Sequence, residues 1–549
     1  MKLSISIIFL LVLTTVLFSI NFSADIGDQN KLEYNNIWSD IKFFSSFKSR
    51  FTGYSGFYSS GDYIYSVFKD IFGENNVRVQ SYNVLSPIDE GSSIEIIKEK
   101  IVFDAYGMYP NLIATGKVKD LTGKLYYAHK GDPSELNIPL NNSIILMDFD
   151  SGDSWIRLIK FGVKAVIFIG SNYTTRFETY SKFIQAPLNF PRLYVTPRVG
   201  RELLKYANGS MVKINLNMSL KLVKAYNYIG IIEGSKYRDK AILFMAHYDS
   251  ASVVPALSPG ADDSIGISLL LELARTLSKT KPKYTLVFVA VSGHWQGLAG
   301  AREFVDEYFF GNFSKKYFPF ITFGFEISSG AAQLVPTLGG FFYSHRHANL
   351  VQTYSTLFGF IQKIFKSYSE LNPEYYNRII SEEVRTGEAF SASTIFNGYA
   401  FPFISDVEAV GLTGSLGITF VTFKDSRVRL FTPIDTLENV DKDNLIPQID
   451  FIEFLLERIL DTDPGKLYTG SISQITPTRL NPRPAGGTGF ANLKIEVVKY
   501  DPTHTKLYSP VPNSIVVIYK VHAWYASGYP YTRYNPFGYI INITDGNGK

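Results

Sequence analysis

The chain has 549 residues, of which 46% are hydrophobic and 19% charged, as in a folded globular protein of roughly two to four domains. A net charge of +4 without a dense basic tract excludes a nucleic-acid-binding protein. The absence of cysteine excludes disulfides and thiolate metal sites, so any metal must be held by Asp, Glu or one of seven His.

The N-terminus begins with an uncharged apolar segment. Lys2 precedes "LSISIIFLLVLTTVLFSI", residues 3–20, whose length suits a secretory leader or a short membrane anchor better than a buried helix. Ala24 offers a cleavage point, so we expect residues 1–24 to be a signal peptide or an anchor. Asn-x-Ser/Thr sequons also favour export and glycosylation. They begin at Asn141, Asn172, Asn208, Asn217, Asn312 and Asn542. We therefore expect an extracellular or cell-surface protein, secreted or N-terminally membrane-anchored.

The first half of the chain predicts helices, then strands, then a small α/β unit. Residues 34–70 have the pattern of two amphipathic helices around a Gly/Tyr turn, and residues 76–130 alternate like strands. Strands are predicted in "SIILMDFD" and "KAVIFIG", with a helix in "SWIRLIKFGV" between them. "PRLYVTPRVGRELLKYA" predicts a strand that leads into a helix.

From residue 226 a larger α/β unit is predicted. Buried strands are expected in "KAILFMAHYDS" (240–250), "YTLVFVAVSGHW" (284–295) and "FITFGFEISSG" (320–330), and a long helix within 260–279. Each strand ends on candidate ligands, which are His247 with Asp249, His294, and Glu326. Strand ends that converge at the carboxyl edge of a sheet form a site.

The C-terminal part has a different composition. A Pro/Gly-rich linker, "QITPTRLNPRPAGGTG", precedes "LKIEVVKY", "NSIVVIYKVHAWYA" and "GYIINIT", which predict strands without intervening helices. We expect a β-sandwich-like domain over 462–549. The chain stops after the turn signal "TDGNGK" at Lys549, so we expect either a longer natural product or a last strand supplied by a partner.

Several of these segments, in this order, resemble the zinc aminopeptidase and glutamate carboxypeptidase family (clan MH), over residues 40–461. The matching signatures are "NYIGIIEGS...AILFMAHYDS", "PGADDSIGISLLLELAR", "GLAGAREFV" and "FTPIDTLENVD". The resemblance implies an α/β fold in which helices flank a central mixed sheet. It also implies a protease-associated domain at 113–221, inserted between the peptidase-like parts at 25–112 and 222–461.

In active members of this family two zinc ions share a bridging carboxylate, polarise the peptide carbonyl and activate water. By resemblance, His247 matches the first His ligand and Asp263 the bridging ligand. Asp249 matches the carboxylate that orients the first His ligand. Glu326 stands where the family has an Asp ligand and keeps the carboxylate.

Other positions depart from the family pattern. His294-Trp295 replaces a Glu-Glu pair, of which the first is the general base and the second a zinc ligand, and Phe431 replaces the last His ligand. One zinc site would then keep only Asp263, because indole and phenyl rings do not ligate zinc. The other keeps His247, Asp263 and Glu326. We therefore expect at most one zinc ion, or none.

Three roles are open for His294, at the general-base position. It could act as a base, become a fourth ligand that closes the site, or only hydrogen-bond Asp263 or Glu326. Asp406, in "ISDVEAVG", matches a Ser-Asp signature near the family's pocket. His345 and His347 are weaker candidates as replacement ligands.

Three functions follow from these patterns. The first is an exported, non-catalytic protein that binds a peptide or protein partner, as in the transferrin receptor and nicastrin ectodomains of the same family. The alternative is a single-zinc exopeptidase or acyl-transfer enzyme, because glutaminyl cyclases of the same clan use one zinc. The third is a cell-surface or homo-oligomeric component that makes contacts through its β-sandwich. Whether the chain is an enzyme is left open by the sequence.

Overall fold

A computed structural model describes residues 31–337, 348–380, 404–479, 490–503, 505–519 and 539–549. The apolar segment at 3–20, Ala24, His345 and His347 lie outside the described residues. Within the described part, no helix is both long and apolar enough to cross a membrane.

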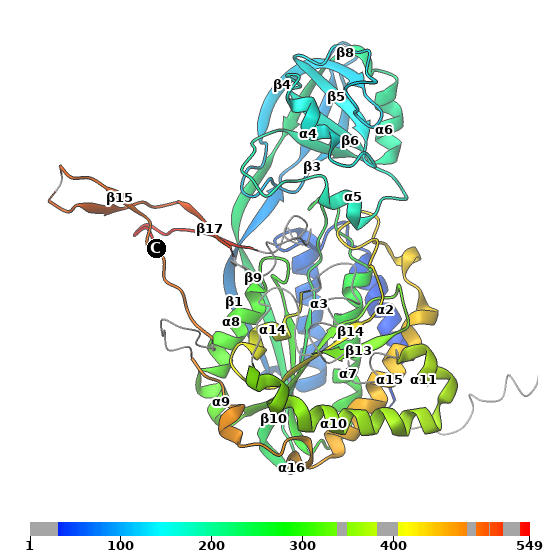
Figure 1. The fold of residues 1–549 in the computed structure, drawn as a ribbon, viewed down its shortest axis with the longest axis vertical. Helices are drawn as coiled ribbons and strands as arrows, with labels where there is room; N and C mark the ends of the chain where they lie inside the picture. Colours follow the sequence, from blue (N-terminus) through cyan, green and yellow to red (C-terminus); the bar gives the residue numbers. More distant parts are fainter. Residues whose placement is uncertain (1–30, 338–347, 381–403, 480–489, 504, 520–538) are drawn as a thin grey trace, which may run out of the picture.

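A seven-stranded mixed sheet forms the centre of the larger unit, in the order β1-β9-β11-β10-β12-β14-β13 (Figure 1). Strand β10 pairs in parallel with β11 and β12, and β12 pairs in parallel with β14, whereas β1, β9 and β13 run antiparallel to their neighbours. The strands are β1 (Val77–Asp89), β9 (Met218–Ile232), β10 (Tyr237–His247), β11 (Tyr284–Val291), β12 (Phe318–Glu326), β13 (Leu334–Thr337) and β14 (Gly417–Thr422). This mixed sheet confirms the predicted fold class.

Helices cover both faces of the sheet and bury it in two hydrophobic cores. On one face lie α2 (Tyr34–Ser45), α3 (Ser55–Phe72), α7 (Ile265–Leu277), α10 (Ala348–Leu371), α11 (Pro373–Ile379) and α15 (Lys442–Asp461). On the other lie α8 (Ala299–Phe304), the π-helix η3 (Val305–Phe309), α9 (Asn312–Lys316) and α14 (Val407–Gly411). Shorter helices are α16 (Pro464–Leu467) and the 3-10 helices η1 (Glu74–Asn76), η2 (Asp262–Ser264), η5 (Leu437–Asn439) and η6 (Ile472–Gln474).

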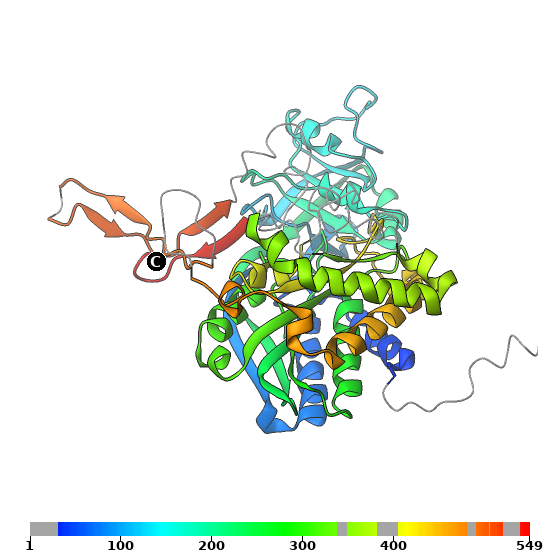
Figure 2. The same ribbon diagram turned by 60° about the horizontal axis from the view of Figure 1, so that its bottom comes forward.

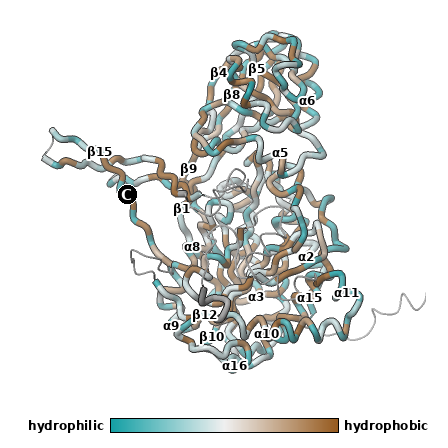
Figure 3. Tube along the Cα trace, viewed as in Figure 1, coloured by the Kyte–Doolittle hydropathy of each residue, from teal (hydrophilic) through white to brown (hydrophobic). Residues whose placement is uncertain are grey.

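Strand β10 shows why the sequence of this sheet is apolar without alternation. Ile242, Phe244 and Ala246 pack into the core beneath α7, while Leu243 and Met245 pack into the opposite core. Successive side chains of a strand point to opposite faces, so a strand covered on both sides is apolar at every position. In Figure 3, hydrophobic residues are coloured brown, and this colour gathers in the centre of the sheet unit.

A closed barrel forms the second unit and lies above the sheet in Figure 1. Its strands follow the order β2-β3-β7-β6-β5-β4-β8 and enclose an aliphatic core. They are β2 (Ser92–Ile96), β3 (Ile101–Gly107), β4 (Val118–Tyr127), β5 (Ser143–Asp148), β6 (Ala165–Ile169), β7 (Arg192–Val195) and β8 (Asn208–Leu216). The accompanying helices are α4 (Ser154–Ile159), α5 (Arg176–Tyr180) and α6 (Pro197–Leu204).

The barrel begins earlier in the chain than the expected insert at 113–221. Strands β2 and β3 pair with β8 and β7, so the barrel closes only when residues from Ser92 onward are included. Strands β1 and β9 pair from Val77 with Gly230 to Asp89 with Met218, and they connect the barrel to the sheet.

The described part of 462–549 contains two two-stranded antiparallel sheets. One pairs β15 (Val498–Tyr500) with β16 (Tyr508–Pro510), and the other pairs β17 (Ile515–Tyr519) with β18 (Tyr539–Ile543). The β15–β16 hairpin projects away from the barrel and the sheet unit in both views (Figures 1 and 2). The expected β-sandwich stays a prediction, because residues 480–489 and 520–538 of this segment are outside the described part.

Candidate metal centre

Two of the predicted ligands lie at the carboxyl ends of adjacent parallel strands. His247 is the last residue of β10, and Glu326 is the last residue of β12. Strands β10 and β12 pair in parallel, so their carboxyl ends meet at one edge of the sheet. The imidazole Nδ1 of His247 lies 3.6 Å from Oε1 of Glu326.

His294 reaches the same edge through a tight turn after β11. That strand ends at Val291, and Gly293 follows with φ of +63°. A Cβ on Gly293 would lie 2.9 Å from the hydroxyl of Tyr82, so the turn requires glycine both for its backbone conformation and for space. The turn places the His294 ring against that of His247, with centroids 3.9 Å apart and planes 23° from parallel.

Asp406 completes the group from a distant part of the chain. It immediately precedes α14, which packs against β12 and β14. Its Oδ2 lies 2.8 Å from Nδ1 of His294 and 3.5 Å from Nδ1 of His247. The Ser-Asp signature predicts that Asp406 lies near the pocket, but the resemblance does not include it among the ligands.

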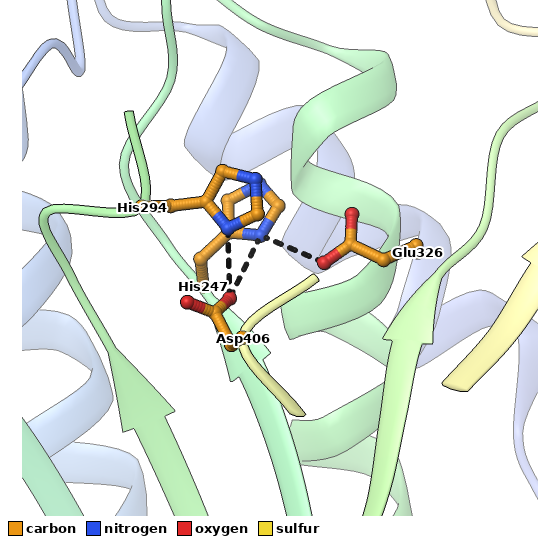
Figure 4. A group of neighbouring side chains, drawn as sticks. All are labelled: His247, His294, Glu326 and Asp406. Carbon is orange, nitrogen blue, oxygen red and sulfur yellow. Dashed lines mark hydrogen bonds and ion pairs between the residues drawn. The ribbon is translucent and has the colours of Figure 1, made fainter. Parts of the chain in front are cut away.

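His247, His294, Glu326 and Asp406 together form what we call the donor group (Figure 4). Each offers one ligand atom, and these four atoms all lie within 4.8 Å of one another. The side chains are only 1–6% exposed. Figure 4 shows the two stacked imidazole rings with Asp406 below them and Glu326 beside them.

The carboxylates of the donor group control its protonation. Burial alone would lower the pKa of His247, but the charges of Glu326 and Asp406 outweigh it and hold that pKa well above its usual value. Burial would raise the pKa of Asp406, but His294 and His247 reverse this and hold it below its usual value. Asp406 is therefore ionised, and the N–H of His294 at Nδ1 donates to it.

Asp263, predicted as the bridging ligand, lies beside the donor group but is not part of it. Its Oδ2 accepts a hydrogen bond from the backbone N–H of Ala251 at 3.3 Å. Burial raises its pKa, while the charges of His247, Arg50 and His294 act in the opposite direction. It therefore remains close enough to interact electrostatically with both imidazoles.

Asp249, predicted to orient His247, has a different hydrogen-bond partner. Its Oδ2 accepts from the hydroxyl of Thr52 at 2.8 Å, and its Oδ1 has no hydrogen-bond partner. Burial raises the pKa of this carboxyl. The orienting role stays a prediction, because no hydrogen bond joins Asp249 to His247.

Trp295 and Phe431, which stand at two positions where the resemblance predicts zinc ligands, are both buried. Trp295 is 7% exposed and lies edge-on to His294, with ring centroids 4.8 Å apart. Phe431 is 1% exposed and packs within 6.0 Å of the rings of Tyr109, Tyr180 and Phe183. We call Tyr109, Tyr180, Phe183 and Phe431 the aromatic cluster. Tyr109, Tyr180 and Phe183 belong to the barrel unit, so that unit packs directly over Phe431.

The donor group fits a single zinc ion. Both ring nitrogens of His247 and Oδ1 of Asp406 are buried without a hydrogen-bond partner, and such atoms need a partner that the protein alone does not provide here. Imidazole nitrogen and carboxylate oxygen are ordinary zinc donors. Trp295 and Phe431 offer no donor atom, and neither residue belongs to the group.

The structure brings together some of the predicted ligands and not others. The structure brings His247 and Glu326 together, as predicted, and adds His294 and Asp406. Of the three roles considered for His294, the geometry shows a hydrogen bond, and its partner is Asp406 rather than Asp263 or Glu326. The assignment of Asp263 as a ligand stays a prediction.

Comparisons with known proteins place the sheet unit in a family. Residues 227–446 match the family described as Peptidase family M28. Nicalin from Caenorhabditis elegans is 35% identical over 123 residues, which are 20% of this chain and 22% of that protein. A probable zinc metalloprotease from Pyrenophora tritici-repentis is 40% identical over 85 residues, or 15% of this chain and 20% of that protein.

Two further matches extend the comparison. Transferrin receptor protein 1 from Gallus gallus is 29% identical over 248 residues, which are 43% of this chain and 28% of that protein. The solved zinc aminopeptidase from Bacillus subtilis matches with a TM-score of 0.50 and 16% identity, over 79% of this chain and 96% of that one. The sequence matches span about a fifth to a quarter of the relatives' lengths, whereas the structural match shows the zinc aminopeptidase fold. Residues 227–446 of this chain therefore match the M28 peptidase family, and the chain has the fold of a zinc aminopeptidase.

Proposed function

We propose that this protein is an exported, non-catalytic member of the M28 family that binds a peptide or protein partner at the cell surface. The observation that carries the proposal is the aromatic cluster. Phe431 stands where the last zinc ligand is expected, and its ring is enclosed by Tyr109, Tyr180 and Phe183. A second metal ion at that position would keep only Asp263 among its expected donors, because a phenyl ring does not ligate zinc.

The state of His294 supports the same proposal. A general base must hold a free lone pair close to the proton that it removes. The Nδ1–H of His294 donates to Asp406 at 2.8 Å, which leaves a lone pair on Nε2, but the side chain is only 1% exposed. Because so buried a ring has little access to water or a substrate, we propose that His294 does not act as a base at the position where the resemblance predicts a glutamate.

Export is supported by the position of the sequons. Asn141, Asn172, Asn208, Asn312 and Asn542 are exposed, and Asn217 is half-buried, so glycans could be attached without unfolding the chain. We propose that the protein is secreted or anchored through residues 3–20. Expression of the full chain in a eukaryotic secretory system tests this location. A mass decrease after glycosidase treatment supports it, and unglycosylated protein retained in the cytosol contradicts it.

The non-catalytic role is tested with purified full-length protein and a panel of aminoacyl and peptidyl substrates. We expect no hydrolysis above the level of a His247→Ala variant, with added zinc or with chelator. Hydrolysis that chelator abolishes and zinc restores would overturn the proposal. Cross-linking at the surface of expressing cells then identifies a protein partner or a second copy of the chain.

A single-zinc exopeptidase or acyl-transfer enzyme is the second candidate, favoured by the two ring nitrogens of His247 that have no hydrogen-bond partner. A zinc ion in the donor group would supply a Lewis acid that polarises a carbonyl. The chain's own contribution would be to hold and orient the substrate near His247 and Glu326. Zinc-dependent turnover that is lost in Asp263→Ala would support this candidate, and unchanged turnover in that variant would eliminate it.

A further inference from the structure

We propose that the donor group is a closed, single-ion zinc site in which His294 and Asp406 are ligands and Asp263 is not. The ion would join segments of the fold and stabilise them, with no role in chemistry. This deepens the proposed function, because a site with four protein ligands leaves no open position for a substrate. The metal assignment does not depend on the absence of hydrolysis, so the two can fail separately.

The first argument is convergence. The four donors come from the end of β10, the turn after β11, the end of β12 and the loop before α14. Zinc bonds of about 2.0–2.2 Å place tetrahedral donors about 3.4 Å apart. The observed separations of Nδ1 of His247 from Glu326 and Asp406 are 3.6 and 3.5 Å. All four donors lie within 4.8 Å of one another.

The second argument is the unsatisfied polar atoms. His247 is 5% exposed, and neither of its ring nitrogens has a hydrogen-bond partner. A buried polar atom without a partner is costly, and most such atoms in proteins are satisfied. A zinc ion would use one nitrogen of His247 and would also engage the carboxylate of Asp406, whose Oδ1 is likewise unsatisfied.

The third argument is charge. Two carboxylates and two neutral imidazoles balance the two positive charges of zinc, so the complete site is neutral in its buried position. A buried charge is stable only when it is paired and hydrogen-bonded.

Asp263 has a different set of neighbours. Its carboxylate accepts from the backbone of Ala251, and the guanidinium of Arg50 contributes a favourable charge. Arg50 is fully buried and donates to the carbonyl oxygens of Tyr248, Pro259 and Gly260. Arg50 and Asp263 therefore stabilise the loop between β10 and α7, and Asp263 has an electrostatic role without the metal.

The experiment is zinc titration of full-length protein that has been stripped with chelator and dialysed, followed by calorimetry and thermal unfolding. We expect one equivalent of zinc and a rise in the unfolding temperature. His294→Gln and Asp406→Asn should weaken binding by about 100-fold or more. The matched control is Asp263→Asn, which removes the same kind of charge and should stay within about threefold of the unchanged protein.

X-ray absorption of the zinc-loaded, unchanged protein keeps the proposal falsifiable if a variant fails to fold. We expect two imidazoles and two carboxylates around the ion. No binding, two equivalents of zinc, or a single imidazole would overturn the proposal. So would an Asp263→Asn variant that loses zinc while Asp406→Asn retains it. Peptide hydrolysis by a protein with one zinc and two imidazoles would instead overturn the non-catalytic function.

Discussion

The donor group and the aromatic cluster each contain a position where the resemblance predicts a different residue, yet the side chains present differ in kind. In the donor group, His294 is at the position of a predicted glutamate and provides a polar atom close to His247. In the aromatic cluster, Phe431 provides no donor and packs as core. The comparison teaches that a region without donor atoms can pack as hydrophobic core while the donor group keeps four ligand atoms within 4.8 Å of one another. The resemblance predicts ligands in both regions, and only the donor group offers them.

The largest expected effect tests whether the aromatic cluster is core. Phe431→Ala removes a buried ring from contact with three others, so we expect the free energy of unfolding to fall by about 3–5 kcal/mol. Denaturant unfolding measures this change. The matched control is Phe177→Ala, because Phe177 is 49% exposed and its loss should cost about 0.5 kcal/mol or less. Equal effects of the two variants would contradict a core role for Phe431.

The second prediction attempts to reverse the difference between the two regions. The double substitution Trp295→Glu with Phe431→His adds a carboxylate and an imidazole at two positions where the resemblance predicts ligands, which together with Asp263 gives three zinc donors. We expect the zinc content to rise from one equivalent to two, measured by elemental analysis of folded protein. A pair of Trp295→Gln with Phe431→His lacks the new carboxylate and should bind only one. A double variant that still binds one equivalent of zinc would show that the lack of donor atoms is not what prevents a second zinc ion from binding.

A smaller effect is expected at Asp249, the carboxylate that the resemblance predicts to orient His247. Thr52→Val removes the hydroxyl that donates to Asp249, and both side chains are fully buried. Because the buried carboxylate loses this hydrogen bond, we expect the free energy of unfolding to fall by about 2 kcal/mol. Thr52→Ser keeps the hydroxyl and should recover most of that loss. Equal destabilisation by Val and Ser would point to packing of the methyl group instead.

The smallest effect separates the two regions by pH. In zinc-free protein the pKa of His247 is raised above its usual 6.5, so its stabilising contribution is complete below about pH 6.5. That contribution is lost as the pH rises through the pKa in the folded state. We expect the unfolding temperature to decline over this range, and less so in Glu326→Gln. Phe431→Ala should lower the unfolding temperature by a similar amount at every pH, since phenyl rings do not titrate.

Much of the sheet could be predicted because its strands are covered on both faces. Runs such as Ile242 to Ala246 are apolar at every position, and the structure confirms a buried strand there. The seven-strand order could not be predicted in the same way, since pairing depends on contacts between distant segments. The same holds for the start of the barrel at Ser92, which is set by pairing of β2 with β8.

The candidate site was predictable where ligands follow strands. His247 and Glu326 end adjacent strands, so their proximity follows from the parallel pairing of β10 and β12. Asp406 lies in a loop about 80 residues beyond Glu326, and only the three-dimensional packing of α14 brings it to the two imidazoles. In the sequence, the Ser405-Asp406 pair was the one signal for this residue. It indicated that Asp406 lies near the pocket but did not predict its contacts with the imidazoles.

The paired strands β1 and β9 attach the barrel to the sheet unit as a separate insert, which we call the cassette. Asp89 and Met218 are register partners, so the chain leaves the sheet unit and returns to it at almost the same point. An exchange of the barrel for a short hairpin would therefore preserve the path of the backbone. It would, however, expose Phe431 to water, because Tyr109, Tyr180 and Phe183 would be removed with the cassette. Any related chain that lacks the barrel must therefore cover this position with something else or replace the phenylalanine.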